Sequence, residues 1–460
     1  MQLSHTFPVV SAVFDDPNLV SSAGLVPVLA LASRAGLVGL VGDCLTLSGP
    51  GSANAPVKVT SLVAGMVAGA DNIDDMDLLR HGAMSRLFTG VRAPSTLGTF
   101  LRTFTFGHVR QLDKVAAGLL RGLVGQSPLL ADVGRVCFID MDDTIKQTYG
   151  YAKQGTGYGY THVNGINALI GTISTPVSAP VIAGTRLRRG PTNSARGAAR
   201  FVADLTATAR SLGATGLVIL RADSAYYNAH VCAAAQRAGA RVSITARLDK
   251  AVLAGIAGIN DDAWVPIRYP NAIWDDDQQR LISNAEVAEI GYTAFTSRPH
   301  REQVPGRLIV RRVKELNPVE GQDELFQAWR YHAVFTTSPL PMLQAETTHR
   351  QHAIIEQVIA DLKNSAMAHC PSSVFTANAA WLVCAAMAFN LTRATGALAS
   401  LFHAKATTAT IRAQLITVPA RIARSARRTV LHLPRDWPWA SAWTGMFNAT
   451  TAPPGRAATS

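Results

Sequence analysis

Several features that are common in other classes of protein are scarce in this sequence, and each shortage is informative. Only five cysteines occur in 460 residues, and no two of them form a Cys-x-x-Cys pair. This argues against a disulfide framework or a cysteine-based zinc site and predicts a reducing, cytoplasmic location. The N-terminus lacks the charged start and apolar stretch of a signal peptide. The apolar stretch 25–40 contains Arg34 and the stretch 379–389 is short, so both are expected to be buried helices.

Acidic residues are also scarce relative to basic ones. The chain has 31 Asp and Glu against 43 Lys and Arg, a net charge of +12. Such a balance indicates a polyanionic partner, either nucleic acid or an anionic membrane surface, and favours nucleic acid. Residues 401–460 hold much of the excess, because Asp436 is their only acid. We expect this basic region to contact the DNA backbone through four arginines: Arg421, Arg424, Arg427 and Arg428.

What the chain does have is the composition and length of a globular protein with more than one domain. Hydrophobic residues make up 48% and charged residues 16%. Residues 1–130 show helical periodicity with little strand signal, which predicts a helical DNA-binding domain. The rest is expected to form an α/β catalytic domain (131–248 and 338–398) interrupted by a β-rich insertion (249–337), then the basic C-terminal region (399–460).

The most informative stretch is an apolar run that ends in three aspartates, RVCFIDMDDT, at 135–144. It predicts a buried strand with Asp140 and Asp142 on one face and Asp143 on the other. Several carboxylates are costly to bury together without a cation. The run therefore indicates a divalent metal or a phosphorylation chemistry, against the simpler alternative of a solvated strand end.

Two further acids are placed to join this group. A second apolar strand, 216–222, stops at Asp223, and a predicted helix from 343 to 365 carries Glu356. On a helical wheel, Glu356 lies within about 60° of His349, His352 and Lys363. Hard oxygen ligands such as Asp142, Asp223 and Glu356 suit a pair of Mg²⁺ or Mn²⁺ ions in phosphoryl transfer. His352 and Lys363 would hold phosphates nearby, although an amphipathic surface helix gives the same pattern.

With these residues in place, the chain resembles the DDE transposases of bacterial insertion sequences, in particular those with a β-rich insertion before the glutamate. The resemblance covers roughly 130–395 and is carried by FIDMDDT with Asp142, by LRADSAYYN with Asp223, and by the helix in which Glu356 is followed after six residues by Lys363. Family members often have Tyr-(2)-Arg-(3)-Glu-(6)-Lys there. This chain has His349 and His352 at the Tyr and Arg positions, which leaves their phosphate-contacting roles open.

The resemblance implies a ribonuclease-H-like mixed sheet flanked by helices, with Asp142, Asp223 and Glu356 as the catalytic and metal-binding residues and Asp140 as a further possible ligand. It also implies two Mg²⁺ or Mn²⁺ ions per site, binding of terminal inverted repeats and of target double-stranded DNA, and a homodimer in the synaptic complex. Strand cleavage would be followed by strand transfer, in a prokaryotic cytoplasm at the nucleoid, with no role for a membrane.

Two other functions are compatible with the same residues. Asp140, Asp142 and Thr144 match the D-x-D-x-T signature of haloacid-dehalogenase-type phosphatases, in which the first aspartate is the nucleophile. That fold needs parallel βαβ units after the motif, whereas the segments that follow here are typical of a hairpin. The other alternative is a transposon-derived DNA-binding protein that has lost catalysis.

Overall fold

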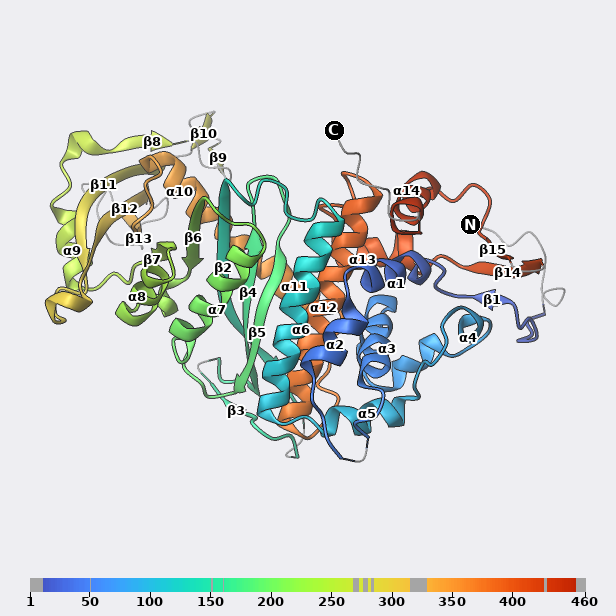
Figure 1. The fold of residues 1–460 in the computed structure, drawn as a ribbon. Helices are drawn as coiled ribbons and strands as arrows, with labels where there is room; N and C mark the ends of the chain where they lie inside the picture. Colours follow the sequence, from blue (N-terminus) through green and yellow to red (C-terminus); the bar gives the residue numbers. More distant parts are fainter. Residues whose placement is uncertain are drawn as a thin grey trace.

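The structure is a computed structural model, and it describes residues 11–49, 51–149, 152–159, 161–267, 273–275, 280–282, 285–314, 329–425 and 428–451. Its centre is a long mixed sheet with helices packed on both faces (Figure 1). Helices from both ends of the chain lie together beyond one edge of this sheet. The β-rich segment that precedes the helix of Glu356 continues the sheet at its other edge. The class is α/β, as the sequence predicts.

The middle of the sheet has the strand order of a ribonuclease-H-like domain. β4 pairs antiparallel with β5 on one side and with β2 on the other, and β6 and β7 then follow parallel to β2. The central strands of the sheet are covered by helices on both faces. Their sequences are therefore apolar runs, with little alternation between apolar and polar residues. Their bounds are β2 (Val136–Gln147), β4 (Asn164–Ser174), β5 (Val181–Arg189), β6 (Leu217–Ala222) and β7 (Arg241–Thr245).

The insertion extends this sheet. β13 pairs antiparallel with β7, and β12, β11 and β8 continue outward from it. The alternating segments identified in the sequence supply these strands, which are β8 (Val265–Ile267), β11 (Ala285–Ala294), β12 (Val304–Lys314) and β13 (Trp329–Thr336). Helix α9 (Lys250–Ala257), whose first turn is capped by the Asp249 side chain, was not expected in this region. Because β13 of the insertion is hydrogen-bonded to β7, the insertion and the catalytic domain form one continuous sheet.

The two faces of the central strands are covered by different helices. α7 (Ala198–Ser211) packs on one face, where Leu205 fills the space above Gly171 and Gly184. α11 (Ile354–Lys363) contacts β2 on the other face. α8 (Ala229–Arg237) crosses from β6 to β7. Since side chains alternate along a strand, Asp140 and Asp142 point to the α11 side and Asp143 points to the α7 side.

Helix α12 (Phe375–Ala399) closes the β5 edge of the sheet. The Asn390 side chain accepts a hydrogen bond from the Ile182 amide (2.8 Å) and donates one to the Ile182 carbonyl (2.7 Å), which satisfies strand groups that would otherwise lie open. α12 is long and apolar enough to cross a membrane by composition alone. However, 83% of its most apolar window is buried inside the fold, as is typical of a core helix.

The N-terminal helices pack around the other side of α12, so the hydrophobic core runs without a break from them into the sheet. The predicted helix at 24–41 is divided at Gly36, whose φ of +86° favours glycine. The elements are α1 (Leu25–Arg34), α2 (Leu37–Cys44), α3 (Ala55–Ala68), the 3₁₀ turn Asp74–Leu79, α4 (Met84–Leu87), α5 (Pro94–Arg102) and α6 (Phe106–Gln126).

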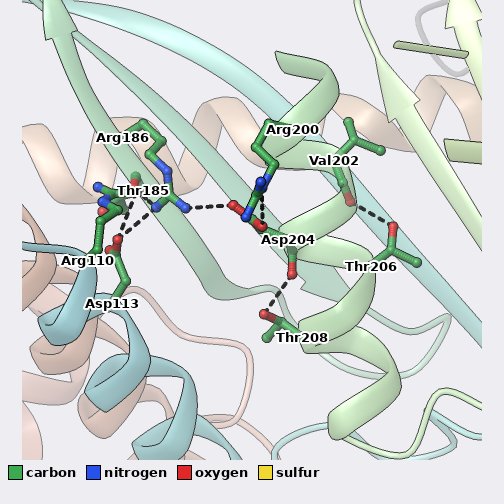
Figure 2. A network of polar contacts seen from close by, with 9 residues as sticks. All are labelled: Arg110, Asp113, Thr185, Arg186, Arg200, Val202, Asp204, Thr206 and Thr208. Atoms are coloured by element: carbon green, nitrogen blue, oxygen red, sulfur yellow. Dashed lines mark hydrogen bonds and ion pairs between the residues drawn. The ribbon is translucent and has the colours of Figure 1, made fainter. Parts of the chain in front are cut away.

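A chain of ion pairs joins α6 to the sheet and to α7 (Figure 2). The Arg186 guanidinium on β5 reaches Asp113 of α6 (3.0 Å) and Asp204 of α7 (2.9 Å). Arg110 and Arg200 complete the chain at its two ends. Burial raises the pKa of Asp113 to about 6, against the opposing effect of the two arginines beside it. The N-terminal helices are therefore held to the catalytic sheet by charge as well as by apolar packing.

The C-terminal region folds against the start of the chain and against α12. A hairpin of β14 (Ala420–Ser425) and β15 (Arg428–His432) pairs with the short strand β1 (Leu19–Val20), which precedes α1. α13 (Thr408–Ile411) leads into the hairpin, and α14 (Ala440–Thr451) ends the described chain on α1 and α12. The basic region is thus largely an ordered part of the structure.

Candidate active site

Asp142 and Asp223 are brought together by the central pair of parallel strands. Met141 on β2 is in register with Ala222 on β6, so the next residue on each strand is one of these two aspartates. Each carboxylate accepts one local backbone hydrogen bond, Asp142 from the Asp143 amide (2.7 Å) and Asp223 from the Ala225 amide (3.0 Å). We call Asp142 and Asp223 the acidic pair. Its oxygens are otherwise available to a ligand.

The acidic pair is electrostatically strained as it stands. The pKa of Asp142 is raised to about 6, chiefly by burial; the nearby carboxylates of Asp223 and Asp143 add to this effect, and the hydrogen bond from the Asp143 amide opposes it. The pKa of Asp223 is also raised, chiefly by loss of solvent. Both groups would ionise more readily beside a cation, and oxygen ligands of this kind suit a hard divalent ion.

Glu356 is not part of this pair. It lies in the first turn of α11, on the exposed side of the helix, and among the residues that the structure describes no three His, Cys, Asp or Glu side chains form a group able to hold a metal. The structure therefore brings Asp142 and Asp223 together, and Glu356 projects from α11, a helix that contacts β2, without completing a metal-binding group among the described residues.

Basic side chains surround the acidic pair. Lys363, at the end of α11, is close enough to Asp142 to feel its charge, and Lys146 on β2 is close to Lys363. Burial lowers the pKa of the Lys363 ammonium, and repulsion by Lys146 adds to this effect. Arg247, which follows β7, donates a hydrogen bond to the Ser224 carbonyl (3.1 Å) and acts on the charge of Asp223. Lys146 and Arg247 were not singled out from the sequence, since nothing in their spacing distinguishes them from other surface cations.

Asp140 has a different environment, although it shares a strand face with Asp142. Its carboxylate is fully buried and receives both Nε (2.6 Å) and Nη2 (2.7 Å) of Arg221. Nδ1 of His352 lies 3.2 Å from the same carboxylate. Burial alone would raise the pKa of Asp140, but the opposing charge of Arg221 and the contact with His352 lower it. Because its oxygens are occupied in this way, Asp140 is a poor candidate for the metal ligand that the sequence left possible.

Arg221 is the residue that sequence reasoning missed. It is 1% exposed, on a strand that is otherwise apolar, LVILRA. Besides binding Asp140, it donates through Nη1 to the Thr348 carbonyl (2.7 Å) and stacks over the Phe138 ring. A charged residue inside an apolar strand needs a partner, so the signal was present in the sequence. We call Asp140, Arg221 and His352 the buried cluster.

The predicted continuous helix from 343 to 365 is broken, and this changes the role of His349. α10 (Met342–Arg350) is separated from α11 by a 3₁₀ turn, Gln351–Ala353. His349, in the last turn of α10, lies against β7, where its two ring nitrogens contact Ser243 and Thr245 at 3.0 Å, and its ring centre is 6.2 Å from that of His352. Burial lowers the pKa of His349 to about 3, so the ring is neutral. Neither nitrogen is available for the phosphate contact expected from the sequence.

Asp143 belongs to a third, separate cluster on the α7 side of the sheet. It accepts hydrogen bonds from the Tyr226 hydroxyl (2.6 Å) and from the Asn167 amide, and it pairs with Arg188 (3.1 Å). The division predicted from strand periodicity, with Asp143 opposite Asp140 and Asp142, is confirmed. Asp143 is thereby neutralised by its own partners and is directed away from the acidic pair.

The arginines expected to contact DNA lie on the C-terminal hairpin. Arg421, Arg424 and Arg428 are exposed on β14 and β15, and Arg427 lies outside the described residues. Arg421 also pairs with Asp16 at 3.2 Å. Three cations on one short hairpin form a surface of the kind that binds a phosphate backbone.

Comparison with known proteins adds the family. The chain matches the family model described as "Transposase DDE domain group 1" over residues 5–451. The chain belongs to this family. A search of curated proteins finds no match. The strand order, the position of Asp142 and Asp223 at neighbouring strands, and the family agree with one another, so the ribonuclease-H-like fold predicted from the sequence is confirmed.

Family membership supports a transposase, and therefore an enzyme of the nuclease or transferase class that acts on DNA. DDE transposases generally use divalent metal ions, which is consistent with the oxygen ligands of the acidic pair. The phosphatase alternative is not favoured. Its nucleophile would be Asp140, which Arg221 holds in a buried ion pair, and β2 is followed by the antiparallel strand β4 in place of a parallel βαβ unit.

Proposed function

We propose that this protein binds the terminal inverted repeats of a mobile element, cleaves the DNA strand at the element end with the help of Mg²⁺, and transfers the freed end to target DNA. The observation that carries the proposal is the acidic pair, in which two carboxylates from adjacent parallel strands meet in a chain of the transposase DDE family. Acids arranged in this way are suited to metal-dependent phosphoryl transfer.

The residues that would hold the metal are Asp142 and Asp223, with Glu356 of α11 as the third ligand. Two Mg²⁺ or Mn²⁺ ions at this position would supply activation of the attacking oxygen and neutralisation of charge on the leaving oxygen. The raised pKa of Asp142 supports this assignment, because a nearby cation would remove the repulsion that keeps the carboxyl partly protonated.

The bond changes of the proposed reaction are simple. In cleavage, a water oxygen bonds to phosphorus, the bond between phosphorus and the 3′ oxygen breaks, and the 3′ oxygen leaves as a hydroxyl. In strand transfer, that 3′-hydroxyl attacks a phosphodiester of the target, and the target's own 3′ oxygen leaves. Lys363 and Lys146, which lie near Asp142, would hold phosphate oxygens during both steps.

DNA binding would be spread over a wider surface than the site itself. Arg421, Arg424 and Arg428 on the C-terminal hairpin are proposed to contact the backbone of the element end, and Arg427, which lies outside the described residues, is proposed as a further contact from the sequence. His352 remains a candidate phosphate contact, although its Nδ1 faces Asp140. We further propose that two copies act together in the synaptic complex, so that both element ends are processed in one assembly at the nucleoid.

The test is a cleavage assay on labelled DNA that carries the ends of the element flanking the gene. The purified protein is incubated with this DNA with and without Mg²⁺, and the cut position is mapped on both strands. The proposal predicts metal-dependent cleavage at the element boundary and none on scrambled ends. Tight binding to the ends without any cleavage in Mg²⁺ or Mn²⁺ would overturn it in favour of a DNA-binding protein that lacks catalysis.

A further inference from the structure

The acidic pair and Glu356 differ in how they are positioned. Asp142 and Asp223 sit on two adjacent central strands, whose pairing fixes them. Glu356 sits in the first turn of a separate helix, just after the 3₁₀ turn at Gln351–Ala353 that interrupts α10 and α11. The direction in which α11 leaves this turn decides where the Glu356 carboxylate lies. What holds the turn is therefore important for the site.

One flank of the turn is open. The turn and the start of α11 border a cavity of about 510 Å³, whose lining includes Gln351, Ala353, Ile354 and Gln357. Phe138 and Arg221 line the same cavity from the sheet side. Apolar packing of the helix start comes from its other flank, where Ile355 is fully buried.

Polar contacts from three neighbouring strands hold the turn. From β6, Nη1 of Arg221 donates to the Thr348 carbonyl in the last turn of α10 (2.7 Å). From β2, Asp140 contacts His352 (3.2 Å). From β7, Ser243 and Thr245 hold both nitrogens of the His349 ring (3.0 Å each). Residues 348, 349 and 352 are thus anchored, and Glu356 follows one helical turn after the last of them.

Arg221 connects these anchors. Its guanidinium binds Asp140 with two nitrogens and the Thr348 carbonyl with the third, so one rigid group ties β2, β6 and the end of α10 together. A planar fork with this geometry cannot be reproduced by lysine. Arg221 and Asp140 are 1% and 0% exposed, so the pair is desolvated, and such pairs are best attested as devices that fix one arrangement among several.

We propose that Arg221 is a positioning residue, which with Asp140 fixes the turn between α10 and α11 and thereby sets the position of Glu356 for catalysis. This inference rests on the proposed function for its catalytic consequence, but the anchoring itself can be tested without DNA. It assigns the buried cluster a role in the reaction, although none of its members needs to touch the metal or the substrate.

The test compares Arg221→Lys with Arg186→Lys, a matched control. Arg186 is less buried, 24% exposed against 1% for the Arg221 side chain, but its guanidinium likewise contacts carboxylates and one backbone carbonyl, and it lies away from the turn, between α6, β5 and α7 (Figure 2). Backbone hydrogen exchange is measured on the full-length, metal-free protein. In Arg221→Lys we expect faster exchange confined to 348–358, with β2 and β6 unchanged. In Arg186→Lys we expect no change in that segment.

The catalytic part of the inference is tested by a double variant. We expect Arg221→Lys to lower the rate of DNA cleavage by about 10- to 100-fold, as supporting residues around metal sites commonly do. In the Glu356→Gln background the same change should add no further loss, because a residue that acts through Glu356 has nothing left to position. Losses that multiply would contradict the inference and indicate a general structural role.

Each remaining outcome also decides the question. Unchanged exchange in 348–358, or equally faster exchange throughout the sheet, would overturn the inference. Local loosening in a protein that cleaves no DNA would overturn the proposed function and leave the anchoring intact. If Arg221→Lys does not fold, Ser243→Ala offers a milder test, because it removes one contact to His349 and should loosen the same segment.

Discussion

Asp140 and Asp142 are two residues apart on one strand face, and their environments are opposite. Asp140 is completely buried and fully paired with Arg221, which lowers its pKa. Asp142 is partly open, lies beside Asp223, and has its pKa raised to about 6. The comparison teaches that an aspartate can be structural support at position 140 and a candidate metal ligand at position 142. The groups that each carboxylate contacts, more than its position in the sequence, decide which role it has.

The largest expected effect comes from breaking the acidic pair. Asp142→Asn or Asp223→Asn should reduce DNA cleavage by about 10³-fold or more, because each removes a charged metal ligand, while leaving binding to the element ends nearly unchanged. Glu356→Gln should lower the cleavage rate by a similar factor, to a residual rate that can still be measured. The measurement combines cleavage rates with a gel-shift titration of the same DNA. Strong cleavage by Asp142→Asn would show that the acidic pair is not the reacting centre.

Breaking the buried cluster should affect folding more than chemistry. Asp140→Asn leaves the Arg221 charge buried without its counter-ion, so we expect a loss of about 3–5 kcal/mol in the free energy of unfolding. Cleavage per folded molecule should fall less than in Asp142→Asn. Urea unfolding followed by circular dichroism measures the first quantity, and active-site-normalised cleavage measures the second. Wild-type stability in Asp140→Asn would mean that the pair with Arg221 contributes little.

The two aspartates should also give opposite pH dependence of stability. The pKa of Asp142 is about 6 in the folded state against its usual value of 3.8, so the protein loses stability as pH rises from about 4 to about 6, and the full penalty is present above that range. Without metal at pH 7, Asp142→Asn should therefore stabilise the protein, by on the order of 1 kcal/mol, and this gain should vanish near pH 4. Asp140, whose pKa is lowered, stabilises the fold above its usual pKa and loses that effect as pH falls below it.

Thermal unfolding in chelator across this pH range tests the contrast. Addition of Mn²⁺ to wild-type protein at pH 7 should restore the stability that is lost when the Asp142 carboxyl ionises. A variant that is equally stable relative to wild type at pH 4 and pH 7 would contradict the assigned pKa.

The smallest effect concerns residues remote from both aspartates. Arg424→Ala and Arg428→Ala on the hairpin should each weaken DNA binding several-fold and lower the slope of log affinity against log salt by about 1, with cleavage of bound DNA unchanged. Arg237→Ala, an exposed arginine on α8, serves as a charge-matched control. Equal losses in all three variants would indicate a diffuse charge effect in place of a defined DNA contact.

Much of the central sheet could be predicted from the sequence, because its strands are apolar runs with clear ends. The placement of Asp142 and Asp223 on or next to adjacent strands followed from this pattern, although β2 continues past Asp142 to Gln147, and the family match is consistent with it. The role of Asp143 on the opposite face followed from the same periodicity.

The helix of Glu356 could not be predicted in the same way. Its sequence is helical on both sides of Gln351–Ala353, and the break depends on contacts from Arg221, Ser243 and Thr245, residues more than 100 positions earlier. Helical periodicity carries no information about such long-range anchors, so the contacts of His349 with Ser243 and Thr245 could not be predicted from the helical wheel. The extension of the sheet by the insertion was hidden for the same reason, because strand patterns do not reveal which strands pair.

The most direct test of the account is a calorimetric titration of the metal-free protein with Mn²⁺ at pH 5 and pH 7, for wild type, Asp142→Asn and Asp140→Asn. We expect wild-type binding that is tighter at pH 7 and releases protons near pH 6, no binding at this site in Asp142→Asn, and retained binding in folded Asp140→Asn. Undiminished Mn²⁺ binding by Asp142→Asn, or its loss in Asp140→Asn alone, would contradict the division between the acidic pair and the buried cluster.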